Sequence, residues 1–208
     1  MGIKIEDEKH LKLKNDNKSS SFIFFISTNL RIIVKTFTHP KNFVNFVALL
    51  NKQDIMSKAI IKTEKGDMTV QFYDNDAPKA VANFKKLASE GFYDGVTFHR
   101  VIPNFMVQGG CPFSKSETTK FRAGTGGPGY HIDCELDGEN QYHDRGVLSM
   151  AHAGRNTGGS QFFICHSRAN TAHLDRNHTC FGKVIENVDL VDDIKQGDKI
   201  LTIEVLAY

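Results

Sequence analysis

Short runs of alternating apolar and polar residues dominate the chain from residue 59 onward. The first two runs, Ala59–Thr63 and Met68–Tyr73, are rich in β-branched and aromatic residues, and the segment between them has turn chemistry. This spacing predicts a β-hairpin. The same kind of pattern predicts later strands at Ile132–Leu136, Gly146–Ala151, Gln161–Cys165, Cys180–Ile185 and Leu201–Leu206.

Two segments have helical rather than alternating periodicity. After Asp76 and Pro78, one apolar face recurs at Val81, Phe84, Leu87 and Ala88, and Gly91 ends the pattern. A second short helix is predicted from Val188, Val191 and Ile194, with Gly197 after it. Many short strands, two helices and no alternation of strands with helices predict an antiparallel sheet or barrel with helices covering its ends.

The first 55 residues differ from the rest in composition. They are rich in Lys and Asn and contain two apolar clusters, Phe22–Ile26 and Asn42–Leu50, of which His39–Leu50 predicts a weak amphipathic helix. The first cluster resembles a signal peptide only faintly, since it is short, lacks a small-residue cleavage site, and Arg31 and Lys35 follow closely. It is also too short to span a bilayer.

The sequence pattern becomes domain-like at Met56. We therefore expect a domain over 56–208 and an N-terminal extension over 1–55 that is disordered or not part of the native domain. One hypothesis is that Met56 is the natural start; the alternative is a mobile tail or a small targeting segment. The intact mass of the protein from its native cell separates these hypotheses. With no convincing signal peptide, we expect the protein to be cytoplasmic.

Composition narrows the function classes. The 208 residues carry a formal net charge of +2, with 40% hydrophobic and 24% charged residues, as in a soluble globular protein. This balance argues against a nucleic-acid or anionic-membrane partner. The chain has 16 Phe and no Trp, so the core must rely on Phe. None of the four cysteines forms a C-x-x-C pair, which favours reduced, buried thiols.

The candidate chemistry centres on residues 98–110. This run combines large apolar side chains with Arg100 and Gln108, and three later segments, 149–154, 159–164 and 172–178, share its composition. Strand alternation places Gln161 and Phe163 on one face, and likewise Phe98 and Arg100 if their strand is regular, with His99 pointing away. Apolar side chains with a few amides, imidazoles and one guanidinium are typical of a peptide-binding cleft.

The string Tyr93–Gly110 resembles the cyclophilin signature along its whole length. The segments 149–154, 159–164 and 174–178 resemble the family's other groove segments, in the right order, and the resemblance covers residues 56–208. It implies a closed eight-stranded antiparallel β-barrel capped by two α-helices, peptidyl-prolyl cis–trans isomerase activity and no cofactor. The loop Gly124–Gly129 lacks the spacing of a phosphate-binding loop, and its composition favours an Ω-like loop. It resembles the corresponding loop of short bacterial-type members of the family.

The resemblance also implies roles for individual residues. Arg100 is the catalytic candidate, because an always-charged donor can stabilise the twisted prolyl bond. Gln108 would orient Arg100, and His178 would lie near the moving carbonyl. The remaining groups would bind substrate: the proline pocket of Phe105, Met106, Phe163 and Leu174, the main-chain contacts of Ala151 and His152, and Gln161 beside them. Taken singly, each of these residues reads as ordinary core or surface. Other apolar neighbours are expected to be core, namely Phe98, Val101, Ile102, Phe162 and Ile164.

Two positions depart from the family pattern. His173, which is also expected to bind substrate, stands where many members have Trp, and His152 replaces the more usual Asn. Loss of the indole face at His173 predicts reduced affinity for cyclosporin-type cyclic peptides. The expected partners are otherwise proline-containing peptides and unfolded or flexible proteins, and the expected state is a monomer.

The sequence leaves two alternative functions open. The first is a non-catalytic proline-peptide-binding module, against which Arg100 argues. The second is a metal site at Cys165 and His166 or at His173 and His178, whose spacing fits neither a helical His pair nor a zinc finger.

Overall fold

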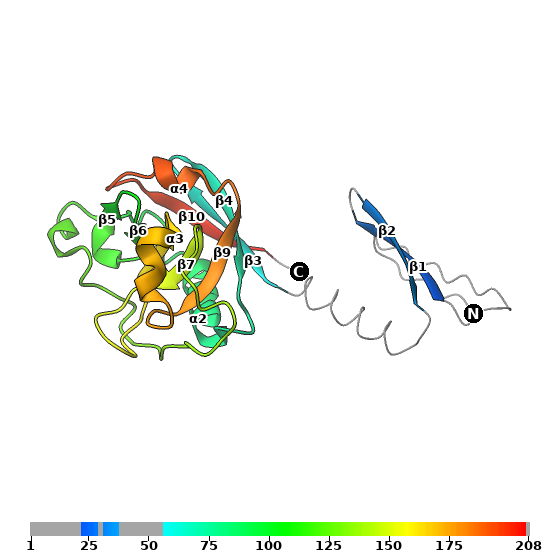
Figure 1. The fold of residues 1–208 in the computed structure, drawn as a ribbon. Helices are drawn as coiled ribbons and strands as arrows, with labels where there is room; N and C mark the ends of the chain where they lie inside the picture. Colours follow the sequence, from blue (N-terminus) through cyan, green and yellow to red (C-terminus); the bar gives the residue numbers. More distant parts are fainter. Residues whose placement is uncertain (1–21, 29–30, 38–55, 207–208) are drawn as a thin grey trace. The chain divides into compact units, whose positions relative to one another are not determined.

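The computed structural model describes residues 22–28, 31–37 and 56–206. The chain divides into two compact units, Met1–Ile55 and Met56–Tyr208. In the first unit, β1 (Phe22–Thr28) pairs antiparallel with β2 (Arg31–Phe37), as Figure 1 shows. The helix predicted at His39–Leu50 lies outside the described residues. The proposed natural start at Met56 stays a prediction.

The second unit is built on one eight-stranded antiparallel sheet that curves into a half-barrel (Figure 1). Its strand order is β10-β3-β4-β9-β7-β8-β6-β5. The bounds are β3 (Lys58–Thr63), β4 (Gly66–Phe72), β5 (Arg100–Ile102), β6 (Met106–Gly109), β7 (Val147–Met150), β8 (Phe162–Cys165), β9 (Cys180–Glu186) and β10 (Ile200–Val205). The prediction of a mainly β, antiparallel fold is confirmed.

Closure of the barrel is not confirmed. The terminal strands β10 and β5 are joined by no continuous ladder. Instead, an isolated bridge links Thr97 to Lys199, and Ile200 N donates to Val96 O at 2.8 Å. The backbone ahead of β5 therefore contacts the start of β10 without completing a regular strand pair.

The predicted hairpin is confirmed, and one predicted strand is wrong. Strands β3 and β4 pair from Lys58 opposite Gln71 to Thr63 opposite Gly66. In the segment 132–136, by contrast, only Ile132 makes a bridge. The next backbone donors bond to side chains, Cys134 N to Asn156 Oδ1 at 2.9 Å and Glu135 N to Thr179 Oγ1 at 2.8 Å. Backbone groups satisfied in this way do not need a strand partner.

The first predicted helix is confirmed as α2 (Pro78–Ser89), with Pro at its first turn and Gly91 in the left-handed region at φ 67°. The carboxylate of Glu135 accepts from Lys79 N at 3.0 Å and Ala80 N at 2.9 Å, and so caps its N-terminus. The second predicted helix is shorter than expected. It is the single turn α4 (Leu190–Asp193), since the backbone of Ile194 is already extended.

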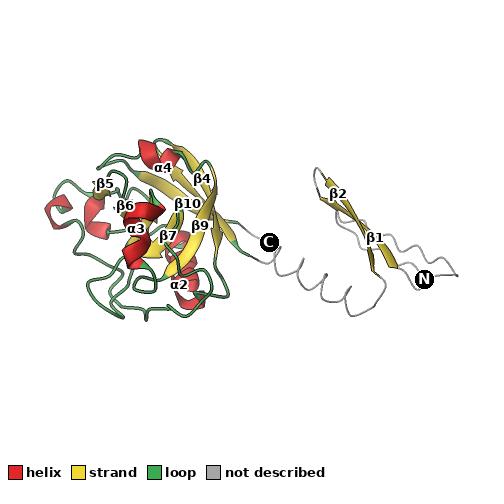
Figure 2. Cartoon of the chain, in the orientation of Figure 1, coloured by secondary structure: helices red, strands yellow, loops and turns green. Residues whose placement is uncertain are grey.

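The other helical segments are short and lie within the loops (Figure 2). They are η1 (Pro112–Lys115), η2 (Lys120–Arg122), α3 (Arg168–Thr171) and η3 (Ala172–Leu174). None of the helices in the described part of the chain is long and apolar enough to cross a membrane.

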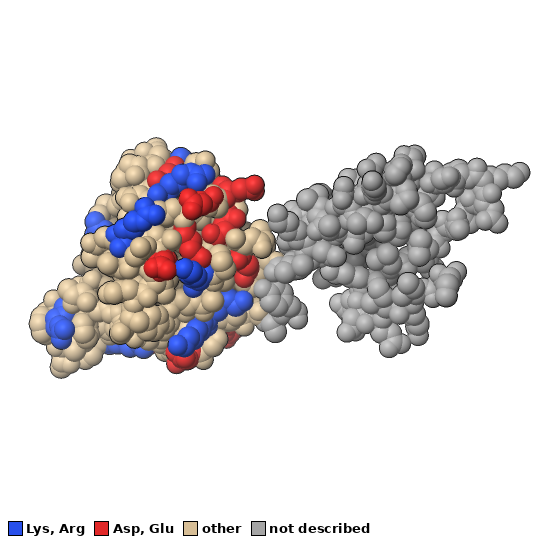
Figure 3. Space-filling model, turned by 90° about the horizontal axis from the view of Figure 1, so that it is seen from below, with Lys and Arg blue, Asp and Glu red and all other residues tan. Residues whose placement is uncertain are grey.

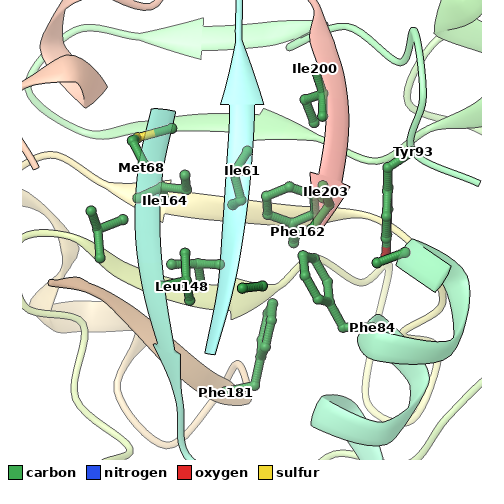
Figure 4. Packing of buried hydrophobic residues seen from close by; sticks show 14 of the residues in the cluster. Ile61, Met68, Phe84, Tyr93, Leu148, Phe162, Ile164, Phe181, Ile200 and Ile203 are labelled. Carbon is green, nitrogen blue, oxygen red and sulfur yellow. The ribbon is translucent and has the colours of Figure 1, made fainter. Parts of the chain in front are cut away.

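The core lies between the sheet and α2 (Figure 4). Phe84 of α2 packs against several rings, with centroid distances of 5.0 Å to Tyr93, 5.1 Å to Phe181 and 5.2 Å to Phe162. Each such aromatic pair adds about 0.5–1.5 kcal/mol beyond area burial. The Phe residues thus fill the core, as the absence of Trp predicted.

Most of the residues expected in the core are there. Phe98, Phe162 and Ile164 are fully buried, and Val101 is partly buried against the same cluster. Ile102 was also expected in the core, but its exposed fraction is 37%. It is the last residue of the three-residue edge strand β5 and has no sheet neighbour on its outer side.

The surface of this unit mixes both signs of charge, as the face in Figure 3 shows. Cross-strand and loop ion pairs account for part of this, such as Lys62 with Glu204 at 2.6 Å and Arg145 with Asp192 at 2.7 Å. Such exposed pairs contribute little individually.

Candidate active site

A groove of about 1240 Å³ runs along the sheet edge formed by β5, β6 and β8. All but one of the predicted site residues line it: Arg100, Phe105, Met106, Gln108, Ala151, His152, Gln161, Phe163, Leu174 and His178. The exception is His173, which is exposed and stacks on the ring of Phe105 at 5.7 Å between centroids. The segments that look alike in sequence are therefore brought together in space.

The apolar part of the groove forms its own small cluster. Met106 and Phe163 are only 2% and 5% exposed, and the partly buried Phe105 and Leu174 pack against them. Strand register explains the arrangement, because Gln108 of β6 lies opposite Phe163 of β8. Met106, two residues from Gln108, therefore points to the same face. The result is a pocket with apolar walls and an amide beside it.

A chain of hydrogen bonds runs from Arg100 to a glycine-rich loop. Arg100 lies opposite Gln108 in the β5–β6 pair, and its Nη1 donates to Gln108 Oε1 at 3.3 Å. Gln108 Nε2 donates to Gln161 Oε1 at 3.0 Å. Gln161 Nε2 in turn donates to the carbonyl oxygens of Gly124 and Gly126, at 2.8 and 2.9 Å.

The loop carbonyls fix the direction of this chain of hydrogen bonds, which we call the amide relay. A carbonyl oxygen only accepts, so Gln161 must present its Nε2 to the loop and its Oε1 to Gln108. Gln108 then presents its own Oε1 to Arg100. The orientation of each amide is thus fixed, and the Gln108 amide is held with its oxygen, an acceptor, facing the guanidinium of Arg100. Within the described residues, no carboxylate pairs with Arg100, whose side chain is exposed to the groove.

Two predictions about residues 98–100 are wrong. Phe98 does not share a face with Arg100, because Phe98 is fully buried while Arg100 is exposed. His99 does not point away from the site but lines the groove. Both errors arise because regular strand structure begins only at Arg100, whereas Thr97 pairs with Lys199 at the other end of the sheet. Neither imidazole nitrogen of His99 has a hydrogen-bond partner among the described residues, and burial lowers the pKa of His99.

The histidines on the other wall form a stacked pair. The rings of His152 and His178 lie 4.0 Å apart at 15°. Nε2 of His152 donates to Asn177 O and Nδ1 of His178 donates to Met150 O, both at 3.0 Å. Burial lowers the pKa of His178 despite the bond to Met150. At neutral pH its Nε2 is therefore unprotonated and acts as an acceptor.

A buried histidine that no sequence motif marks lies beneath the pocket. His143 stacks on Phe163 with 5.7 Å between centroids, and its nitrogens approach Asp175 Oδ1 at 3.2 Å and Ser149 Oγ at 2.9 Å. The spatial arrangement Asp175–His143–Ser149 resembles that of a serine-hydrolase triad. However, Ser149 and His143 are both 0% exposed, so no substrate can reach them. Burial lowers the pKa of His143 to about 4. His143 thus supports the pocket floor as a neutral ring.

The groove also has a wall that the motifs did not identify. It consists of Phe113, Arg122 and the loop 123–131. Only the glycine content of the loop marked this wall in the sequence. In the described part of the chain, no group of three or more His, Cys, Asp or Glu side chains is placed to hold a metal ion.

An apolar pocket beside a guanidinium held by uncharged amides is an arrangement typical of a peptide-binding cleft. Comparison with known proteins agrees with this class. The sequence model of the family described as "Cyclophilin type peptidyl-prolyl cis-trans isomerase/CLD" matches residues 58–205. The chain therefore belongs to the cyclophilin-type peptidyl-prolyl cis–trans isomerases, and its activity is that of the family.

Individual relatives support this assignment. A peptidyl-prolyl cis-trans isomerase of Synechococcus elongatus is 54% identical over 154 residues, which cover 73% of this chain and 98% of the relative. Peptidyl-prolyl cis-trans isomerase B of Bacillus subtilis is 51% identical over 135 residues, covering 65% and 87% of the two chains. The crystal structure of a cyclophilin type isomerase from Cryptosporidium parvum matches with a TM-score of 0.62 at 30% identity, over 74% of this chain and 99% of that one. A second structure of that protein, in the presence of the dipeptide Ala-Pro, gives a TM-score of 0.61.

Proposed function

We propose that Arg100 catalyses rotation about X–Pro bonds by donating a hydrogen bond to the prolyl nitrogen of the twisted amide. Rotation breaks amide resonance against a barrier of roughly 18–20 kcal/mol. In the planar ground states the nitrogen lone pair is conjugated, whereas in the twisted state it becomes an acceptor. A donor placed there stabilises the transition state selectively. One such donor contributes about 3–4 kcal/mol, or roughly 100- to 1000-fold in rate.

The observation that carries this proposal is the environment of Arg100. Its guanidinium borders the apolar pocket and is held through Gln108, an uncharged partner, at 3.3 Å. A carboxylate partner would compete for the N–H groups, while an amide oxygen leaves the remaining donors of the guanidinium for the substrate. The relay through Gln161 would hold the guanidinium in place during turnover.

The other groove residues would bind and align the substrate. Phe105, Met106, Phe163 and Leu174 form the pocket for the proline ring. Ala151 N already donates to Gln161 O at 3.0 Å, so main-chain pairing with a substrate would fall to the carbonyl oxygen of Ala151. His152 would support His178 by stacking, and His178 would contact the carbonyl that moves.

The proposed substrates are proline-containing segments of unfolded or flexible proteins. A groove of about 1240 Å³ exceeds the roughly 300–1000 Å³ of a drug-sized site and suits an extended peptide. Cyclosporin-type cyclic peptides are proposed to bind with reduced affinity, since His173 offers less apolar surface than Trp. The monomeric state, the cytoplasmic location and full closure of the barrel remain predictions.

The test is exchange spectroscopy on a short Xaa-Pro peptide with a substoichiometric amount of the full chain. We expect the cis and trans resonances to exchange many times faster than in buffer, where interconversion takes tens to hundreds of seconds. An unchanged exchange rate with a peptide that nevertheless binds would support the non-catalytic module instead.

A further inference from the structure

The lining of the groove has a charge pattern that isomerisation does not require. It includes two arginines, Arg100 and Arg122, and four histidines, but no aspartate or glutamate among the described residues that form it. The rest of this unit carries many carboxylates, several of them paired with arginines, such as Asp192 with Arg145 and Asp175 with Arg168. The charged side chains of the groove lining are therefore all basic, whereas the surface around it carries charges of both signs.

The two arginines supply the fixed part of this positive charge. Burial lowers the pKa of both His99 and His178, so these two imidazoles are neutral at neutral pH. An arginine, in contrast, stays protonated throughout the physiological range. Of the two arginines, Arg100 is engaged by Gln108 at the proline pocket. Arg122 is left to act on another part of a bound peptide.

Arg122 is held on a rigid support. It ends η2, and its guanidinium lies over the ring of Phe113 with the central carbon 4.1 Å from the ring centroid. The loop that follows packs on the same ring, since a Cβ on Gly126 would come within 2.8 Å of Phe113 Cδ2. The same loop is tied to Gln161 by two hydrogen bonds. A stacked guanidinium loses less side-chain freedom on binding than a mobile one.

Arg122 also lacks the carboxylate partners that Arg145 and Arg168 have. Arg145 and Arg168 each contact two aspartates, whereas no carboxylate in the described residues forms an ion pair with Arg122. Its exposed guanidinium can therefore accept a carboxylate in the planar, two-bond geometry that arginine favours.

We propose that the groove selects proline segments with an acidic side chain, Asp or Glu, within a few residues of the proline, and that Arg122 recognises this carboxylate. The inference rests on the proposed function, because the proline must occupy the pocket at Arg100. An extended peptide advances about 3.3–3.6 Å per residue. A side chain one or two residues from the proline is therefore displaced along the groove by about 3–7 Å relative to the proline.

The test is a comparison of kcat/KM for matched peptides. Each set places Glu, Gln or Lys at a single position, either two residues before the proline or one after it, in otherwise identical sequences. In one of the two sets we expect Glu to exceed Gln by about 1.5- to 5-fold, the range for an exposed arginine–carboxylate pair, with Lys below Gln. The difference should shrink at high salt, because exposed charges are screened.

Variants of the full chain locate the effect. Arg122→Gln should bring the Glu-to-Gln ratio close to one, and Arg122→Glu should favour the Lys peptide. The matched control is Arg155→Gln, which removes the same charge from an exposed residue outside the groove lining and should preserve the ratio. A ratio measured within one protein sample does not depend on how much of that sample is folded.

The outcomes separate the two claims. Equal kcat/KM for all three side chains in both sets, with normal turnover, would overturn the proposed selectivity while the isomerase function stands. A wild-type preference that persists in Arg122→Gln would overturn the assignment to Arg122. Failure to turn over any peptide would instead contradict the proposed function itself.

Discussion

The amide relay behind Arg100 makes a quantitative prediction about Gln161. This residue orients Gln108 by accepting from its Nε2 at 3.0 Å, and is itself oriented by the carbonyls of Gly124 and Gly126. Gln161→Ala removes the acceptor, so the Gln108 amide is free to flip and present its Nε2 to the guanidinium. Two donors then face each other, and Arg100 loses its anchor.

The size of the effect follows from the bond that holds the Gln108 amide. A net hydrogen bond contributes about 0.5–1.5 kcal/mol, so kcat should fall about 2- to 12-fold in Gln161→Ala. Substrate affinity should change less, because the apolar pocket does not include Gln161. Steady-state kinetics on one Xaa-Pro peptide separates kcat from KM. The matched control is Gln196→Ala, an exposed glutamine outside the groove lining, which should keep the wild-type kcat.

A second substitution distinguishes the relay from simple loss of packing. Gln161→Glu keeps an acceptor for Gln108 Nε2 but loses both donations to the loop. If amide orientation matters, this variant retains more of kcat than Gln161→Ala. A wild-type kcat in Gln161→Ala, or a lower kcat in Gln161→Glu than in Gln161→Ala, would rule out this role of Gln161.

Three further predictions concern stability and ligand binding. His143 has a pKa of about 4 in the fold against 6.5 unfolded, so the unfolded chain binds the proton first and this group lowers stability by up to about 3 kcal/mol as pH drops from 6.5 to 4. Denaturant titrations across this range should show a smaller dependence in His143→Asn than in wild type, since the variant keeps only other contributions such as those of the buried His99 and His178. Gly110→Ala should be strongly destabilising, since φ is +88° and the added Cβ would lie 2.3 Å from Ser160 O; an unfolding midpoint equal to that of wild type would rule out this clash. His173→Trp should tighten cyclosporin inhibition by about 2- to 12-fold, because an indole adds roughly 0.5–1.5 kcal/mol of aromatic contact. An unchanged inhibition constant would show that this position does not touch the inhibitor.

Local patterns predicted the elements whose hydrogen bonds are local. The hairpin β3–β4 and the helix α2 follow from alternation, a Pro at the first turn and Gly91 after the last. The segment 132–136 shows where such patterns fail. Its apolar alternation is real, but its backbone bonds to Asn156 and Thr179, which are distant in sequence. No local signal encodes those partners.

The candidate site was predictable to the extent that short motifs encode it. The motifs identified which residues line the groove, because residues with that composition recur in a fixed order. They did not predict the direction of His99, since the strand is irregular before Arg100. Nor did they predict Arg122 or His143, whose roles depend on the ring of Phe113 and the underside of Phe163. Contacts of this kind arise only once the chain is folded.

The central claim is that Arg100 donates to the prolyl nitrogen in the twisted state rather than merely binding substrate. The most direct measurement is exchange spectroscopy on one Xaa-Pro peptide, which yields kcat and Kd for the full-length wild type, Arg100→Lys and Arg100→Ala. If Arg100 donates to the prolyl nitrogen, Arg100→Ala loses about 100- to 1000-fold in kcat while Kd changes far less, with Arg100→Lys in between. A kcat close to that of wild type in Arg100→Ala, or a loss found entirely in Kd, would contradict it.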